Sequence, residues 1–331
     1  MIPETMNSAP PSQTSWLPRR FAFWLMLLAA VVLENSRATE TNGQPFRVGF
    51  SRSLFTDVNE NDAEAAVKIW GQTIAKERGI AADTQTRIFQ DTTQLRQALL
   101  NQTVDAVGIS AIEYATVSRE ARLAPIFVTY NNGRYQEQYF VLVRRDSQLN
   151  QLADLRGRSL VFHQNMRACL AQPWLDTLLH KATGQFTAEC VGKLTQVPKL
   201  SQAVLPVFFH QLDACVITSA EFEIMCELNP QIGQQLKIIA TSPTVVTSVL
   251  CFRSDYAPAF KPQIFTALRD LDKTPAGQQV LTIFQSEKIE DQPASCMDSA
   301  LELLAAHDRI CGVTNATKNL ASPQIAGRTA P

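Results

Sequence analysis

Residues 104–114 and residues 212–222 of this chain follow one plan, and this repeat constrains the fold more than any other feature. Each copy has an Asp, a short apolar run typical of a buried strand, a small hydroxyl residue and an apolar-periodic helix. Ser110 and Ser219 stand at N-cap positions, so we expect the free N–H groups of both helices to open near the same edge of a sheet. Two such units predict two α/β lobes that face each other across a cleft, which suits the capture of a small molecule.

The composition is that of an ordinary folded protein. Its 331 residues allow one or two globular domains, and a content of 45% hydrophobic and 18% charged residues provides a sizeable core. The net charge of −1 indicates no excess of positive charge that would attract nucleic acid, and the sequence has no acidic tail. We therefore expect no binding to nucleic acid.

The N-terminus has the pattern of an export signal. Arg19 and Arg20 precede an apolar run over residues 21–33, and residues 36–38 place small side chains at the offsets that a signal peptidase uses. The run is shorter than the ~20 residues that a membrane span needs. We predict a cleaved signal peptide over residues 1–38 and export to the periplasm; the alternative is an uncleaved segment that tethers the protein to the membrane.

The seven cysteines form no CxxC pair and the four histidines are scattered, so we predict neither a metal site nor a cofactor. In an exported protein, cysteines are candidates for disulfide bonds. The first pairs to test are Cys169 with Cys190 and Cys296 with Cys311, and the odd total leaves at least one thiol unpaired. Cys215 suits the core better, where Cys packs as a small apolar residue.

Short strands alternate with helices along the chain, which predicts an α/β fold with mainly parallel sheets. One strand is expected near residues 188–191, and another over residues 247–252 offers a route back to the first lobe, so the lobes interleave in the sequence. The predicted boundaries are residues 1–38 for the signal peptide, 46–138 and 250–312 for the first lobe, 139–249 for the second lobe, and 313–331 for a polar, disordered tail.

Several segments resemble one known family in their order and spacing. They are residues 104–114, residues 140–147 followed by residues 152–157, residues 213–219 and residues 240–243. In this order the chain resembles the phosphate/phosphonate-binding family of periplasmic solute-binding proteins that serve ABC importers, over about residues 46–307. The resemblance implies a type II periplasmic-binding-protein fold: two α/β lobes joined by two hinge strands, with a ligand in the cleft and closure by hinge motion.

The segments expected to bind the ligand differ from the pattern usual in that family. The loop over residues 163–169 lacks the family's cluster of hydroxyl residues, Ser110-Ala111 replaces a Gly-Pro pair, and Tyr139 stands where a small Ser is usual. The class of ligand must therefore be inferred from the chemistry of the residues in these segments.

Ten residues are candidates for contact with a ligand, because most of them stand where a strand gives way to a helix, and open α/β sheets bind ligands at that edge. Helix N-termini present unpaired N–H donors and a partial positive charge, and an Arg adds a bidentate grip on an oxyanion. The alternative roles are a solvated surface position for the arginines, helix capping for the serines and a place in the sheet for the Tyr. The candidates are Ser51, Arg52, Ser110, Ala111, Tyr139, Asn165, Arg167, Ala168, Thr218 and Ser219.

We predict a monomeric binding protein, not an enzyme, that captures a small anionic solute such as a phosphate or phosphonate and delivers it to the permease of an ABC importer. One alternative is ligand sensing, in which the closed form docks on a membrane sensor kinase or cyclase. Another is an enzyme on the same fold, with Cys169 as nucleophile and His163 nearby as its base.

Overall fold

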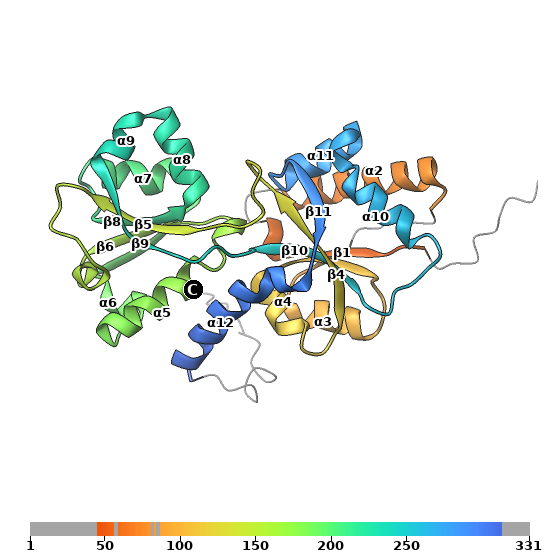
Figure 1. The fold of residues 1–331 in the computed structure, drawn as a ribbon, viewed down its shortest axis with the longest axis horizontal. Helices are drawn as coiled ribbons and strands as arrows, with labels where there is room; N and C mark the ends of the chain where they lie inside the picture. The colour runs from red at the N-terminus through yellow and green to blue at the C-terminus, as the bar shows by residue number, and fades with distance from the viewer. Residues whose placement is uncertain (1–44, 56–58, 81–82, 84–86, 313–331) are drawn as a thin grey trace, which may run out of the picture. The chain divides into compact units, whose positions relative to one another are not determined.

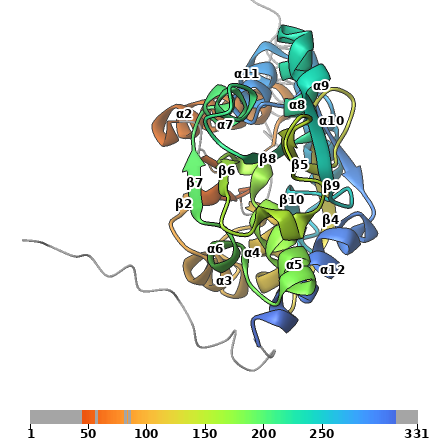
Figure 2. The ribbon, with the colours of Figure 1, turned by 90° about the vertical axis from the view of Figure 1, so that its left-hand side faces the viewer.

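The computed structural model describes residues 45–55, 59–80, 83 and 87–312. The predicted signal peptide (residues 1–38) and the predicted tail (residues 313–331) lie outside these residues. Among the described helices, none is both long and apolar enough to cross a membrane. The described residues form two β-sheets, each with helices on both faces (Figure 1, Figure 2).

The first sheet has six strands. Their bounds are β1 Val48–Ser51, β2 Arg87–Phe89, β3 Ala106–Ser110, β4 Leu123–Tyr130, β10 Ser248–Arg253 and β11 Lys288–Gln292. The strand order is β11-β4-β10-β3-β1-β2, with β2, β1 and β3 parallel and the remaining pairs antiparallel. One face is covered by α2 (Glu60–Arg78), α10 (Lys261–Arg269) and α11 (Pro275–Ile283), and the other by α3 (Thr92–Leu100) and α4 (Ala111–Val117) (Figure 1).

The second sheet has five strands in the order β7-β6-β8-β5-β9. Their bounds are β5 Tyr139–Arg144, β6 Ser159–His163, β7 Lys193–Val197, β8 Ala214–Thr218 and β9 Leu236–Thr241. Figure 1 shows α7 (Leu200–Phe208), α8 (Ser219–Leu228) and α9 (Pro230–Gln235) on one face, and α5 (Ala171–Thr183) and α6 (Thr187–Cys190) on the other. Short 3-10 turns complete the fold: η1 Arg52–Phe55, η2 Leu152–Leu155, η3 Met166–Ala168, η4 Leu271–Lys273 and η5 Ala294–Met297.

The two copies of the repeated segment form the same strand–helix unit, β3–α4 in the first sheet and β8–α8 in the second. Each unit begins with an Asp that accepts a hydrogen bond from a backbone N–H at the start of a neighbouring strand or directly before it. Asp105 accepts from Arg47 N at 2.9 Å, and Asp213 accepts from Ser159 N at 2.8 Å. Both strands are buried along their whole length, as their apolar runs predict.

Each of these two helices begins at a capping box, in which a hydroxyl residue and a Glu three residues later satisfy each other's backbone N–H groups. Ser110 caps α4, as predicted, and its partner is Glu113. The cap of α8 is Thr218 rather than the predicted Ser219, because Thr218 Oγ1 accepts from Glu221 N at 3.2 Å.

Two chain segments connect the sheets: residues 131–138 lead from β4 to β5, and residues 242–247 lead from β9 to β10. They pair through Glu137 and Val245, each of which donates its N–H to the other's C=O at 2.8 Å. Helix α12 (Asp298–Ile310) forms a third connection, because it packs against both α4 and α5 and shares one hydrophobic core with them. The two predicted α/β lobes and their two crossing segments are confirmed.

The sheets are less parallel than predicted. Strands β5 and β10 run antiparallel to their neighbours because the chain enters each of them from the other lobe. The prediction of a strand near residues 188–191 is wrong, because this segment is the helical turn α6 and the residue that follows it. Phe186 N donates to Glu189 Oε2 at 3.1 Å and so caps this turn. The strand of this region is β7, which begins at Lys193.

The predicted disulfide bonds are wrong: all the cysteines are free thiols, and each lies within the described residues. Cys169 and Cys190 flank α5, and Cys296 and Cys311 flank α12. Helix α12 has 13 residues and is therefore about 20 Å long, which places Cys296 and Cys311 far beyond bonding distance.

Candidate functional site

A polar cavity of about 600 Å³ lies where strands β6 and β8 of the second sheet end. We call it the polar cavity. Two of its lining residues, Asn131 and Gln285, come from segments beside strands β4 and β11 of the first sheet, so both lobes contribute to it. Its lining residues are Asn131, His163, Asn165, Arg167, Pro198, Lys199, Thr218, Ala220, Glu221, Ile224 and Gln285.

Arg167 is the cation held most firmly in this wall, and its side chain is only 12% exposed. Its Nη1 donates to Glu137 Oε1 at 2.9 Å and its Nη2 donates to Gln285 O at 2.7 Å. Its Nε is buried and has no partner among the described groups. A planar guanidinium with one unsatisfied N–H can donate a hydrogen bond to an oxyanion.

The backbone around Arg167 is held from two sides. Tyr139 Oη donates to Arg167 O at 2.8 Å, and Asn165 Oδ1 accepts from both Arg167 N at 2.8 Å and Ala168 N at 2.9 Å. Tyr139 is itself fully buried and its ring lies beside that of Trp174, so it belongs to the core and not to the cavity surface. Its observed contact orients the loop that carries Arg167.

Glu137 lies in the crossing segment, and its side chain is buried. Burial raises the pKa of Glu137, and this effect outweighs the lowering by Arg167; the charge of Glu221 raises the pKa further. The carboxyl group that neutralises Arg167 is therefore more easily protonated than an ordinary Glu.

Glu221 is the central carboxylate of the polar cavity. Its Oε1 lies 2.6 Å from His163 Nδ1 and accepts from Asn165 Nδ2 at 2.5 Å, while its Oε2 accepts from Thr218 N at 2.8 Å. Asn165 and Thr218 were predicted as ligand contacts, and both line the cavity. In this structure their polar groups are bonded to the protein's own carboxylate.

Glu113 has the corresponding position in the first lobe. Its Oε2 accepts from Ser110 N at 2.9 Å, from Ser110 Oγ at 2.8 Å and from Ser53 Oγ at 2.8 Å, and its Oε1 accepts from Ser51 Oγ. The predicted ligand residues Ser51 and Ser110 are thus buried against Glu113 and do not line the polar cavity.

The first N–H group of each repeated helix is also taken by the protein. Ala111 N donates to Thr247 O at 2.8 Å, and Ser219 N donates to Gln138 O at 2.7 Å. Both acceptors belong to the crossing segments. The first and third N–H groups of each repeated helix are therefore taken by a crossing segment and by the capping box, which corrects the expectation that these groups are free at the sheet edge.

The structure brings three of the predicted site residues together in the polar cavity: Asn165, Arg167 and Thr218. Arg52 is exposed and donates to Gln90 Oε1 at 2.9 Å, away from this cavity. The two capping-box glutamates, Glu113 and Glu221, were not among the predicted site residues. Their signal was present, because Ser/Thr followed three residues later by Glu marks a capping box in both copies of the repeat.

The environment of Cys169 does not match that of an activated nucleophile. Burial raises the pKa of its thiol to about 12, and its Sγ lies 3.5 Å from Thr247 O. His163 instead contacts Glu221. An activated thiol needs a lowered pKa and an adjacent base, and neither is present here.

A family model describing the periplasmic substrate-binding protein of phosphonate ABC transporters matches residues 53–295 of the chain. Among curated proteins, none matches the sequence.

Solved structures share the fold at low sequence identity. A Xanthomonas citri protein bound to ATP is 16% identical with a TM-score of 0.58, covering 82% of this chain and 100% of its own. The binding-protein component of a phosphonate ABC transporter from Pseudomonas aeruginosa is 14% identical with a TM-score of 0.53, covering 83% of this chain and 90% of its own. A Prochlorococcus marinus protein in complex with methylphosphonate is 13% identical with a TM-score of 0.53, covering 81% and 98%. At these identities the likeness establishes the fold, which is that of type II periplasmic binding proteins.

Proposed function

The chain belongs to the family of periplasmic substrate-binding proteins of phosphonate ABC transporters, and from this premise we propose that it captures a small anionic solute in the polar cavity. The family is a transporter component that works in the periplasm, so a permease is the natural partner of the loaded form. The family match lends no support to the role of a sensor partner or to catalysis.

The single observation that carries the anionic ligand is the unsatisfied Nε of Arg167. A buried N–H without a partner costs stability, and a phosphonate, phosphate or sulfonate oxygen would satisfy it with a charge-assisted bond. Lys199 lines the same cavity and adds a second positive charge. The grip on the anion is therefore assigned to side-chain cations, because the first and third N–H groups of α8 already have protein partners.

A contact between the two lobes links ligand binding to lobe closure. Arg167 belongs to the second lobe, whereas its acceptor Gln285 O belongs to the first, at 2.7 Å. An anion bound at Arg167 would therefore lie beside a contact that joins the two lobes. Binding that favours this contact would favour the closed form, which is the form that a permease recognises in a hinge-closing protein.

A thermal-shift screen tests the proposal with methylphosphonate, phosphate, methanesulfonate and a neutral sugar. At a hundred times its dissociation constant, a true ligand stabilises the fold by ~2.7 kcal/mol. Arg167→Ala should abolish the shift given by the best anion. Arg96→Ala is the matched control, because Arg96 pairs with Glu120 on the surface at 2.5 Å and does not line the cavity.

Two results would overturn the proposal. One is a shift with the neutral sugar and none with any anion. The other is an anion shift that Arg167→Ala leaves unchanged while the variant is folded by circular dichroism.

A further inference from the structure

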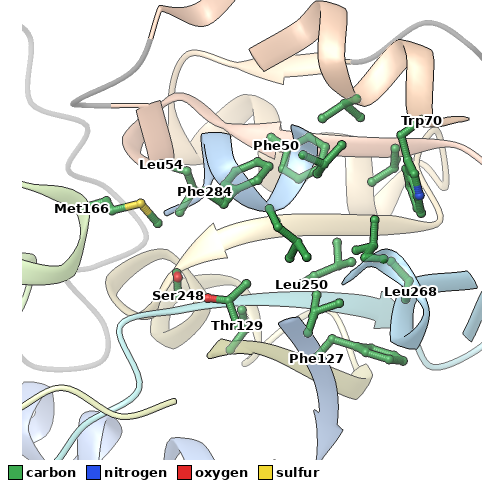
Figure 3. Close-up of a pocket in the computed structure, with 18 of the residues that line it drawn as sticks. Phe50, Leu54, Trp70, Phe127, Thr129, Met166, Ser248, Leu250, Leu268 and Phe284 are labelled. Atoms are coloured by element: carbon green, nitrogen blue, oxygen red, sulfur yellow. The ribbon is translucent and has the colours of Figure 1, made fainter. Parts of the chain in front are cut away.

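A second cavity, of about 70 Å³, lies inside the first lobe, and we call it the apolar cavity (Figure 3). It lies between the first sheet and helices α2, α10 and α11, and nearly all of its lining side chains are apolar. Leu250 and Phe127 from the sheet, Trp70 from α2, and Leu268 from α10 are among the residues that enclose it. Empty cavities of this kind stay dry and accept apolar molecules.

At two places in the chain, consecutive residues line different cavities. Met166 lines the apolar cavity and Arg167 lines the polar one; in the same way Phe284 lines the apolar cavity and Gln285 the polar one. The hydrogen bond from Arg167 Nη2 to Gln285 O, at 2.7 Å, lies at this boundary. These two segments therefore form part of the wall between the cavities.

Met166 belongs to the second lobe, yet its side chain is only 6% exposed and packs in the core of the first. Figure 3 shows it entering from the side, next to Leu54 and Phe284, and pointing toward the cavity. Trp70 lies at the far side of the cavity in this view, and its buried Nε1 has no partner among the described groups. The flexible thioether chain of Met166 thus occupies one side of the apolar cavity.

We infer that the solute is amphipathic, with an anionic head at Arg167 and a short alkyl tail that takes the place of Met166 in the apolar cavity. The inference rests on the proposed function for the position of the head group. The tail adds affinity by leaving water, and Met166 competes with it for the same space. Thr129 and Ser248 line the apolar cavity near Met166, so the passage between head and tail is the more polar part of its wall.

The test is a calorimetric titration of methyl-, ethyl-, propyl- and butylphosphonate, which keep one head and lengthen the tail. Affinity should rise about fourfold for each methylene buried, or about sixty-fold over the series. Leu250→Trp fills the apolar cavity and should bring the butyl-to-methyl affinity ratio close to one. Leu228→Trp is the matched control, because Leu228 is 77% exposed and lines neither cavity, and it should keep the full ratio.

Met166→Ala keeps the test decisive if Leu250→Trp does not fold. Removal of the competing side chain should raise the butyl-to-methyl ratio by about tenfold. A bromobutylphosphonate should also quench Trp70 fluorescence, and Trp70→Phe should remove that signal.

The outcomes separate this inference from the proposed function. If methylphosphonate binds but the series is flat in the unmodified protein, the tail site is overturned and the anion site survives. If no phosphonate binds, the anion site is overturned. Titration with 1-hexanol, which has no anionic head, then tests the apolar cavity by itself. A change in Trp70 fluorescence supports the apolar site, and no change overturns it.

Discussion

Glu113 and Glu221 have the same position in two copies of one turn, and each satisfies the backbone N–H of the residue that caps its helix. Glu113 Oε2 accepts from Ser110 N at 2.9 Å, and Glu221 Oε2 accepts from Thr218 N at 2.8 Å. Each carboxylate therefore lies at a helix N-terminus, where an external anion would otherwise be favoured. This placement disfavours an external anion at the helix ends and is consistent with our proposal that Arg167 and Lys199 hold the ligand.

Glu113 should be a major contributor to the stability of the first lobe. Glu113→Ala leaves a buried backbone N–H and three hydroxyl groups without their charged acceptor, and we expect it to lower the free energy of unfolding by about 3 kcal/mol. Denaturant unfolding measures this. Glu223→Ala removes an exposed ion pair with Arg134 and should cost less than about 1 kcal/mol; equal effects of the two substitutions would show that the Glu113 network is not stabilising.

Anion affinity should depend on the protonation of Glu137. Burial raises the pKa of Glu137, so on acidification it loses its charge earlier than an ordinary Glu, and Arg167 then loses its competing carboxylate. Affinity for methanesulfonate, whose own charge is constant, should therefore increase as the pH falls through this raised pKa. Glu137→Gln should bind more tightly and remove the dependence.

His163 also lines this cavity, where its Nδ1 lies 2.6 Å from Glu221 Oε1. His163→Asn therefore serves as the control for the pH titration. If this variant removes the pH dependence and Glu137→Gln leaves it, the assignment to Glu137 is wrong.

Two glycines should respond in opposite directions to Ala. A Cβ at Gly71, inside α2, would meet no atom within 4 Å, so Gly71→Ala should stabilise the protein by about 1 kcal/mol through the higher helix propensity of Ala. A Cβ at Gly277, in α11, would lie 2.1 Å from Leu271 O, so Gly277→Ala should destabilise by about 1–3 kcal/mol. Thermal unfolding measures both, and a neutral Gly277→Ala would mean that η4 and α11 pack less closely than described.

Thiol reactivity should distinguish Cys311 from the other cysteines. Cys311 is exposed, whereas burial raises the pKa of the Cys169 thiol to about 12 and that of the Cys296 thiol to about 11. A thiol reagent at pH 8 should modify Cys311 rapidly in the native protein and all seven cysteines after unfolding. Cys311→Ser should remove the fast phase; rapid modification of Cys169 would revive the enzyme alternative.

The repeated segment predicted the most local features correctly. A buried strand that begins with Asp and ends at a capping hydroxyl residue is dictated by neighbouring residues, and both copies formed it. Strand β11 could not be found in this way, because Lys288–Gln292 is mostly polar and becomes a strand by pairing with the edge of β4. Its structure depends on a partner more than 150 residues away in the chain.

The environment of Arg167 could not be predicted from the sequence. The sequence places an Arg in the loop after β6, but whether this Arg faces solvent or a buried carboxylate depends on Glu137, which reaches it from the crossing segment at 2.9 Å. The same holds for Ser51 and Ser110. Their hydroxyl groups were predicted to contact a ligand, and in the fold they donate to Glu113.

The sequence by itself determined the two lobes, the repeated strand–helix unit and the family, because these follow from apolar periodicity and from residues close together in the chain. Only the tertiary structure decided which polar groups remain for a ligand and where an apolar cavity lies. The physical reason is that hydrogen-bond partners and empty space are properties of groups brought together from distant segments, and no local pattern of residues specifies them.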